Sequence, residues 1–120
     1  MATILVHIHT GPGDATKAAL GLLVAATAAK KGHAVSVFLA GDGVHLLGAD
    51  TAATLEGVGT GKVSDHLAAL SDLGVRFHVS GMSAKARGYD ESLLAGQAAE
   101  FAMPDRLVDL ATEADTVLCY

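Results

Sequence analysis

The sequence predicts an α/β protein, a three-layer α/β/α sandwich with a mostly parallel sheet of about five strands. Short β-branched segments alternate along the chain with longer Ala- and Leu-rich segments that have helical character. Such alternation produces right-handed βαβ crossovers, which place helices on both faces of a parallel sheet. Of the 120 residues, 51% are apolar and 18% are charged, so a core can form, and we treat residues 1–120 as a single domain.

The first third of the chain predicts a strand, a helix and a second strand. Ile4–His9 is short and β-branched, and it is followed by the turn-forming run Thr10–Gly13. Asp14 is placed to cap a helix that ends near Lys31, where a glycine follows. Ala34–Ala40 alternates in polarity and predicts the second strand.

The middle of the chain has a weaker pattern. Val44–Ala49 is interpreted as a short helix, whereas Asp50–Gly61 is interpreted as a loop because its Thr, Ala and Gly residues show no period. Ser64 begins a helix with leucines three residues apart, and Gly74 ends it. Val75–Val79 then predicts strand three.

The last third predicts two further strands. Ser83–Gln97 has partly helical character that is interrupted at Gly88, with Ser83 as the cap, and Ala98–Ala102 predicts a short edge strand. Pro104 suits the first turn of a helix whose apolar residues recur at helical spacing. Thr116–Tyr120 predicts the final strand.

Charge and hydropathy exclude several classes of partner. A formal net charge of -5 repels phosphate backbones, so no nucleic-acid partner is expected. The longest apolar stretch, Ala18–Ala29, would span about 18 Å as a helix against a hydrocarbon core of about 30 Å, so no membrane span is expected. A single cysteine and the lack of a leader pattern favour a cytoplasmic location.

The predicted first helix is apolar on every side. Ala, Leu and Val occupy nearly all positions of Ala18–Ala29, and a helix of this kind is normally buried all round. Because each helix of a small sandwich usually keeps one face in water, we expect a second copy of the chain to cover this helix in a homo-oligomer. The alternative is that small alanines merely raise helix propensity.

The sequence contains no motif for metal binding, cofactor binding or hydrolysis. His7 and His9 share a strand face, but the other histidines are scattered and zinc requires three or four converging ligands, so neither a metal nor a cofactor is predicted. Ser80 lies two residues from His78, yet the nucleophile motif G-x-S-x-G is absent. Nucleotide binding is a third alternative that rests only on the usual position of α/β sites, because neither glycine-rich nucleotide motif is present.

A small anion is the ligand class that the loops favour. In parallel sheets, ligands lie at the carboxyl ends of the strands, and Lys85 and Arg87 bring two of eight basic residues to the segment after strand three. The alternative is a capped helix start with two solvated bases. The predicted ligand-binding residues are Thr10, Asp42, Ser80, Gly81, Met82, Ser83, Lys85 and Arg87.

Several segments resemble the DsrE/DsrF-like (YchN-like) family, above all the run Gly81-Met82-Ser83-Ala84-Lys85-Ala86-Arg87-Gly88 after strand three. Ile4–Val6, Phe38–Val44, Leu73–Val75 and Glu113–Leu118 are also similar, so the resemblance covers essentially the whole chain. It implies a five-stranded parallel sheet, assembly into trimers or hexamers, and a role linked to sulfur relay. In sulfur-relay members of the family, a cysteine just after the third strand carries sulfur as a persulfide.

Ser80 occupies the position of that cysteine. A serine hydroxyl cannot form a persulfide, whereas a thiolate can. We therefore expect a non-catalytic, oligomeric small-ligand-binding or assembly subunit related to sulfur-relay proteins. The alternative is a sulfurtransferase subunit that uses Cys119, or the cysteine of a hetero-partner. The strand order of the family implies that Cys119 lies three strand spacings, about 14 Å, from strand three. We interpret Cys119 itself as a small buried hydrophobic residue.

Overall fold

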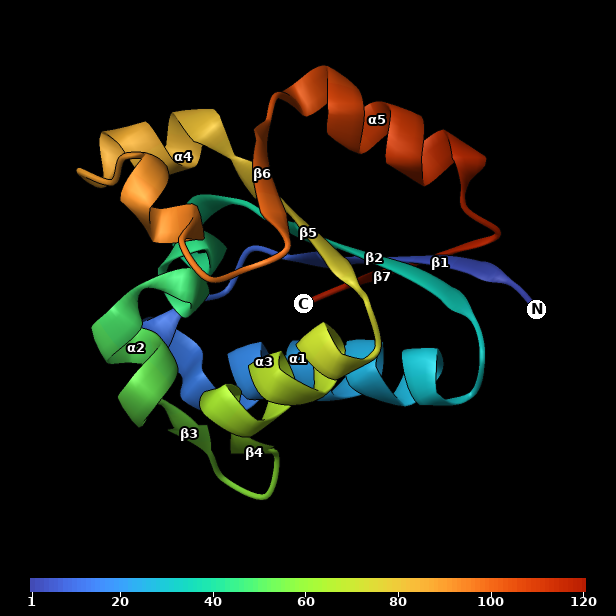
Figure 1. Ribbon diagram of the computed structural model, residues 1–120, viewed down its shortest axis with the longest axis horizontal. Coiled ribbons are helices and arrows are strands. Elements are labelled where there is room, and N and C mark those ends of the chain that lie inside the picture. Colours follow the sequence, from blue (N-terminus) through green and yellow to red (C-terminus); the bar gives the residue numbers. More distant parts are fainter.

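A computed structural model describes residues 1–120 and contains one five-stranded sheet and a small hairpin (Figure 1). All strand pairs of the large sheet are parallel, in the order β6-β5-β2-β1-β7. Its strands are β1 (Thr3–Ile8), β2 (Ala34–Leu39), β5 (Arg76–Ser80), β6 (Ala99–Ala102) and β7 (Thr116–Cys119). The predicted sheet is confirmed, including the edge position of the strand at 99–102.

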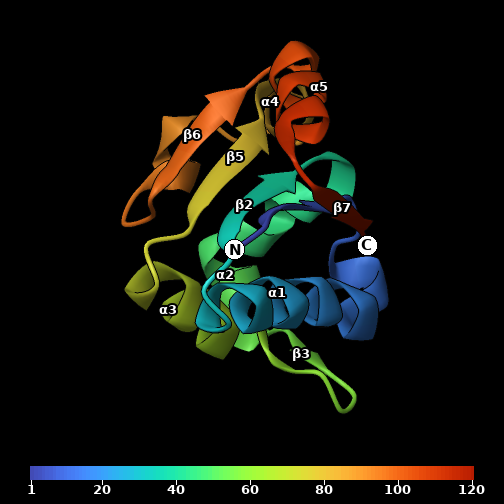
Figure 2. The ribbon, with the colours of Figure 1, turned by 90° about the vertical axis from the view of Figure 1, so that its right-hand side faces the viewer.

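Helices cover the two faces of this sheet unequally. The helices α1 (Ala15–Lys30) and α3 (Val63–Asp72) pack on one face, and α5 (Pro104–Glu113) lies on the other (Figure 2). Chain order explains the division: β1, β2 and β5 advance in one direction across the sheet, whereas the connection from β6 to β7 returns past them. The predicted three-layer sandwich is confirmed. No helix combines the length and the apolar composition that crossing a membrane requires.

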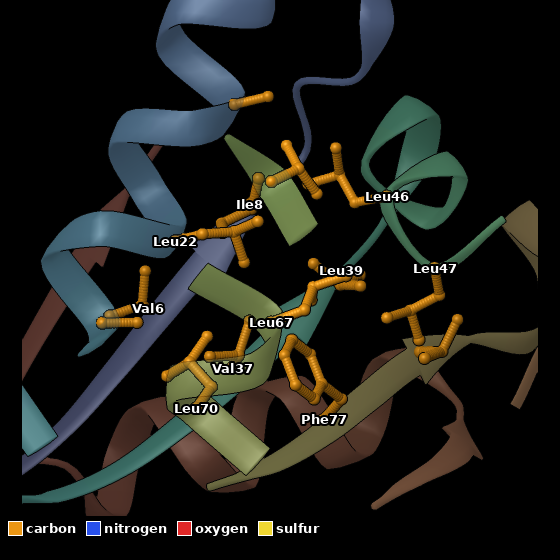
Figure 3. Close-up of a cluster of buried hydrophobic side chains, with 14 of the residues drawn as sticks. Val6, Ile8, Leu22, Val37, Leu39, Leu46, Leu47, Leu67, Leu70 and Phe77 are labelled. Carbon is orange, nitrogen blue, oxygen red and sulfur yellow. The ribbon is translucent and has the colours of Figure 1, made fainter. Parts of the chain in front are cut away.

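The main core lies between the sheet and the helices α1 and α3. Alternate strand residues such as Val6, Val37 and Phe77 face this layer, where they meet Leu22 and Leu70 (Figure 3). All five are at most 1% exposed. On α5, by contrast, no residue is fully buried, so the second face of the sheet is the more open one.

The first helix begins and is buried largely as its sequence predicts. The Lys17 N–H donates to Asp14 Oδ1 at 3.1 Å, which makes Asp14 the predicted cap. The sheet and α3 cover the side that carries Ala18, Leu22 and Ala25. On the remaining side, Leu23 and Val24 are only half-buried, because no element of this chain lies over them.

Asp50–Gly61 is not a loop, and this prediction is wrong. It contains the helix α2 (Ala49–Thr54) and most of a hairpin formed by β3 (Glu56–Gly57) and β4 (Gly61–Lys62). The hairpin is held from outside: the Val58 N–H donates to Thr16 Oγ1 at 3.0 Å, and the Thr60 hydroxyl donates to the Thr16 carbonyl at 3.0 Å. The helix predicted at 44–49 is instead the 3₁₀ segment η2 (Gly41–Leu47).

The helix caps differ from the predicted ones in two places. The helix α3 begins at Val63, and no side chain caps it, so Ser64 lies inside its first turn. After β5, the cap is Ser80 and not Ser83. The partly helical segment resolves into α4 (Gly81–Ala86) and the 3₁₀ segment η3 (Glu91–Leu94), separated by Gly88 with φ +81°.

Candidate functional site

The loops after β1 and β2 approach each other closely at the carboxyl edge of the sheet. A Cβ atom on Gly11 would collide with the carbonyl oxygen of Asp42, and one on Gly43 would collide with the carbonyl oxygen of Ile8. Glycine is therefore required at both positions by the contact between backbones. The glycine-rich loop after β1 therefore has a structural role, because it allows η2 to pack against the end of β1.

Ser80 ends β5 and begins α4. Its side chain is turned inward, with the residue 8% exposed, and its Oγ accepts the Ser83 N–H at 3.1 Å. This bond satisfies one of the unpaired N–H groups of the first helical turn. The hydroxyl therefore has a structural partner, and it is directed at the backbone of α4.

Three of the other predicted ligand residues form a tie between α4 and η2. The Gly41 N–H donates to Ser83 Oγ at 2.9 Å. The Arg87 guanidinium donates through Nε to Asp42 Oδ1 at 3.0 Å and through Nη1 to the Ser83 carbonyl at 3.1 Å, while its Nη2 lies 3.0 Å from Asp42 Oδ1. Asp42, Ser83 and Arg87 thus meet as predicted, but they bind one another.

Two residues that the sequence did not single out extend this tie. His45 Nδ1 lies 2.7 Å from the hydroxyl of Tyr89, and His45 Nε2 lies 4.0 Å from Asp42 Oδ1. The rings of His45 and Tyr89 pack edge to face, with centroids 5.4 Å apart. The only available signal was their position near the ends of β2 and α4.

The side chains of the remaining predicted ligand residues form no hydrogen bond or ion pair within the chain. Lys85 and Met82 are exposed on α4, Met82 by 59%, and the Lys85 ammonium forms no ion pair. Gly81 and Thr10 are half-buried. None of the cavities in the chain is lined by these residues or by Ser80, Ser83 and Arg87.

Cys119 lies far from Ser80. It is exposed on the edge strand β7, so the prediction of a buried residue is wrong. The sheet order places three strand spacings between β7 and β5, as the family resemblance implies. Its backbone neighbour on β1 is His7, so the two side chains share the sheet face on the α5 side. The ring of His7 lies 5.3 Å from that of His9 and 5.8 Å from that of Phe38.

Two histidines on this face have lowered pKa values. Burial lowers the pKa of His7, and the neighbouring His9 lowers it further. Burial also lowers the pKa of His78, an effect that Glu100 opposes and that Arg106 and Arg76 reinforce. No three His, Cys, Asp or Glu side chains converge on a point where they could hold a metal ion.

Comparisons with known proteins agree on one family and one fold. The sequence model of the DsrE/DsrF-like family matches residues 2–120. The structure is similar to the crystal structure of the YchN protein from E. coli, with a TM-score of 0.82 and 18% sequence identity over 100% of both chains. At this identity the likeness demonstrates a shared fold. No curated protein matches the sequence significantly.

Proposed function

Because the chain belongs to the DsrE/DsrF-like family, we propose that it is a non-catalytic, oligomeric subunit that binds a small ligand or supports assembly, related to intracellular sulfur-relay proteins. The observation that carries this proposal is the state of Ser80. At the end of β5, where the resemblance expects a sulfur-carrying cysteine, an oxygen atom accepts the Ser83 N–H at 3.1 Å.

The Ser80 hydroxyl differs in reactivity from a thiol that carries sulfur. A thiolate is a nucleophile near neutral pH because its pKa lies near 8.5, whereas a serine hydroxyl needs an activating base. No histidine or carboxylate forms a hydrogen bond with Ser80. The only hydrogen-bond partner of its side chain is the backbone N–H of Ser83. The residue at this position therefore stabilises α4 and cannot carry sulfane sulfur.

The exposed side of α1 supports the oligomeric part of the proposal. Leu23 and Val24, with Ile4 of the first strand, line an almost wholly apolar groove of about 380 Å³. A second copy of the chain that covered this groove would remove its apolar surface from water, which favours association by about 25 cal/mol for each Å² buried.

The ligand that we propose for the carboxyl edge is a small anion near Lys85. Arg87 is already neutralised by Asp42, so Lys85 is the cation there without a partner. Lys85 is exposed in the last turn of α4. Substitution Lys85→Gln should therefore weaken anion binding at this edge, whereas Lys30→Gln, at an exposed position in the last turn of α1 and so away from this edge, should leave it unchanged.

Sulfur loading followed by intact-mass spectrometry tests the non-catalytic role. The protein and its Cys119→Ser variant are incubated with thiosulfate or polysulfide, and then with an acceptor thiol. We expect no transfer of sulfur from either protein to the acceptor. An adduct of about 32 Da, one sulfur atom, that forms on the natural protein, is absent from the variant and passes to the acceptor would contradict the proposal.

Sedimentation tests the assembly role independently. We expect a trimer or hexamer at micromolar concentration by analytical ultracentrifugation, and Val24→Asp should shift the mass toward the monomer because it places a charge in the apolar groove. A monomeric mass for the natural protein would remove the homo-oligomer. A mass that changes only when a sulfur-relay protein is added would favour a hetero-partner instead.

A sulfurtransferase subunit that uses Cys119 is the second candidate, and one observation favours it. The thiol is exposed and shares a sheet face with His7, its neighbour across the β1–β7 pairing. Burial keeps the His7 ring uncharged near neutral pH, so it can accept a proton. The loading experiment decides between the two candidates, since only this one predicts a transferable adduct that the Cys119→Ser substitution abolishes.

A further inference from the structure

A groove of about 480 Å³ with a mixed polar and apolar lining lies near the amino ends of the strands, away from the carboxyl edge. Its lining includes Ser36 of β2, His78 of β5, Glu100 of β6 and Arg106 of α5. These strands are neighbours in the sheet, and α5 lies across from α1 and α3 (Figure 2). The volume is in the range of pockets that bind small molecules.

Among the charged side chains that line this groove, hydrogen-bond donors outnumber acceptors. Two guanidinium groups reach it from different elements, Arg76 from β5 and Arg106 from α5. Arg106 has no ion-pair partner, and Arg76 has only a contact of 4.0 Å to Glu100 Oε2. His33 also lines the groove, and because its Nδ1 accepts the Ala2 N–H at 3.0 Å, its proton is on Nε2.

His78 supplies a buried polar atom that lacks a hydrogen bond. The residue is 4% exposed, and its Nδ1 is fully shielded without a hydrogen-bond partner. Glu100 Oε1 lies 3.2 Å from this nitrogen, but outside hydrogen-bonding geometry. Unpaired buried polar atoms are rare in folded proteins and call for a physical reason.

We propose that this groove is a second ligand site, which takes a small molecule bearing an oxyanion group: a carboxylate, sulfate or phosphate. Two arginines against one carboxylate give the groove an excess of one positive charge within a chain of net charge -5. Guanidinium groups bind planar and tetrahedral oxyanions through paired N–H donors. The oxyanion lies against Arg106 and Arg76, next to Glu100 and the shielded ring of His78.

Glu100 gives the site a feature that general attraction to positive charge does not share. Its carboxylate is half-exposed and lies beside both Arg76 and His78, so it competes with an incoming anion. Replacing it with glutamine removes that competition and leaves a side chain of the same size. The same substitution at Glu56, an exposed carboxylate on the distant hairpin, alters net charge equally without touching the groove.

The test is a titration of the full-length, ¹⁵N-labelled protein with inorganic phosphate and, separately, with succinate, followed by NMR at constant ionic strength. We expect saturable shifts of amide resonances at Arg76, His78 and Arg106. Arg106→Gln should weaken the affinity at least about tenfold, the usual effect of losing one charge-assisted contact. Glu100→Gln should strengthen it several-fold, while Lys62→Gln and Glu56→Gln should leave it unchanged.

Two results would contradict the proposed oxyanion site. Shifts that sodium chloride reproduces, or an affinity that falls equally in Lys62→Gln and Arg106→Gln, would show general charge attraction and overturn the proposal. An affinity lost in Lys85→Gln but kept in Arg106→Gln would place the anion at the carboxyl edge instead. The amide spectrum of each variant reports whether it is folded, and succinate binding without phosphate binding narrows the ligand to carboxylates.

Discussion

Removing the hydroxyl of Ser80 should measurably destabilise the protein. In Ser80→Ala, the Ser83 N–H loses the oxygen that accepts it at 3.1 Å, in a position that is 8% exposed and therefore poorly reached by water. Loss of a serine cap costs about 1 kcal/mol, and an unpaired donor at a shielded site raises the cost toward about 2 kcal/mol. With a urea m-value of about 2 kcal/mol/M, the unfolding midpoint should fall by roughly 0.5 to 1 M.

Urea unfolding followed by far-ultraviolet circular dichroism measures this change, since the chain has no tryptophan for fluorescence. Ser64→Ala is the matched control: Ser64 is exposed in the first turn of α3, and its hydroxyl caps nothing. Its effect should stay within about 0.5 kcal/mol. Equal midpoints for the two variants would refute the structural role that we assign to Ser80.

Three further predictions concern the core, the histidines and the tie between α4 and η2. Phe77 is 1% exposed, so Phe77→Ala should lower the free energy of unfolding by about 3 to 5 kcal/mol in the same urea assay. Because burial lowers the pKa values of His7 and His78, the unfolded chain binds protons that the folded rings do not. The contribution of the two histidines to stability is complete above about pH 6.5 and is lost as the pH falls through their folded pKa values. The urea midpoint should therefore decline on acidification, and it should decline less in a variant in which both histidines are replaced by glutamine. A double-mutant cycle on Asp42 and Arg87, whose side chains are 64% and 30% exposed, should give a coupling of about 0.2 to 1 kcal/mol that shrinks in high salt; a salt-independent value would contradict an exposed pair.

The elements that the sequence predicts well are those whose signals are local. The first helix begins at its Asp14 cap and β6 was recognisable at 98–102, because capping residues and short apolar runs act over a few positions. The hairpin of β3 and β4 was missed because its anchor is Thr16, more than 40 residues earlier in the chain. Ser83 resembled a cap in sequence, yet its hydroxyl accepts the distant Gly41 N–H and Ser80 caps α4 instead.

The sequence likewise predicted only part of the candidate site. Since the carboxyl ends of parallel strands meet at one edge, the sequence could place Asp42 near Arg87, although 45 positions separate them. It could not show that the two would neutralise each other, because that depends on the length and direction of both side chains. The groove beside His78 gave no signal at all, since its residues come from separate elements that only the sheet order brings together.

The end of β5 shows how one backbone geometry can support either chemistry or structure. A strand that turns directly into a helix exposes N–H groups at its last side chain. A cysteine in that place would have its thiolate stabilised by these donors, and its pKa lowered, which is what a sulfur carrier requires. Ser80 receives one of the same donors on an oxygen that does not ionise, so the bond contributes to folding alone. With that donor engaged and Arg87 bound to Asp42, Lys85 is the cation that stays unpaired on α4, whereas Arg76 and Arg106 line the separate groove beside His78.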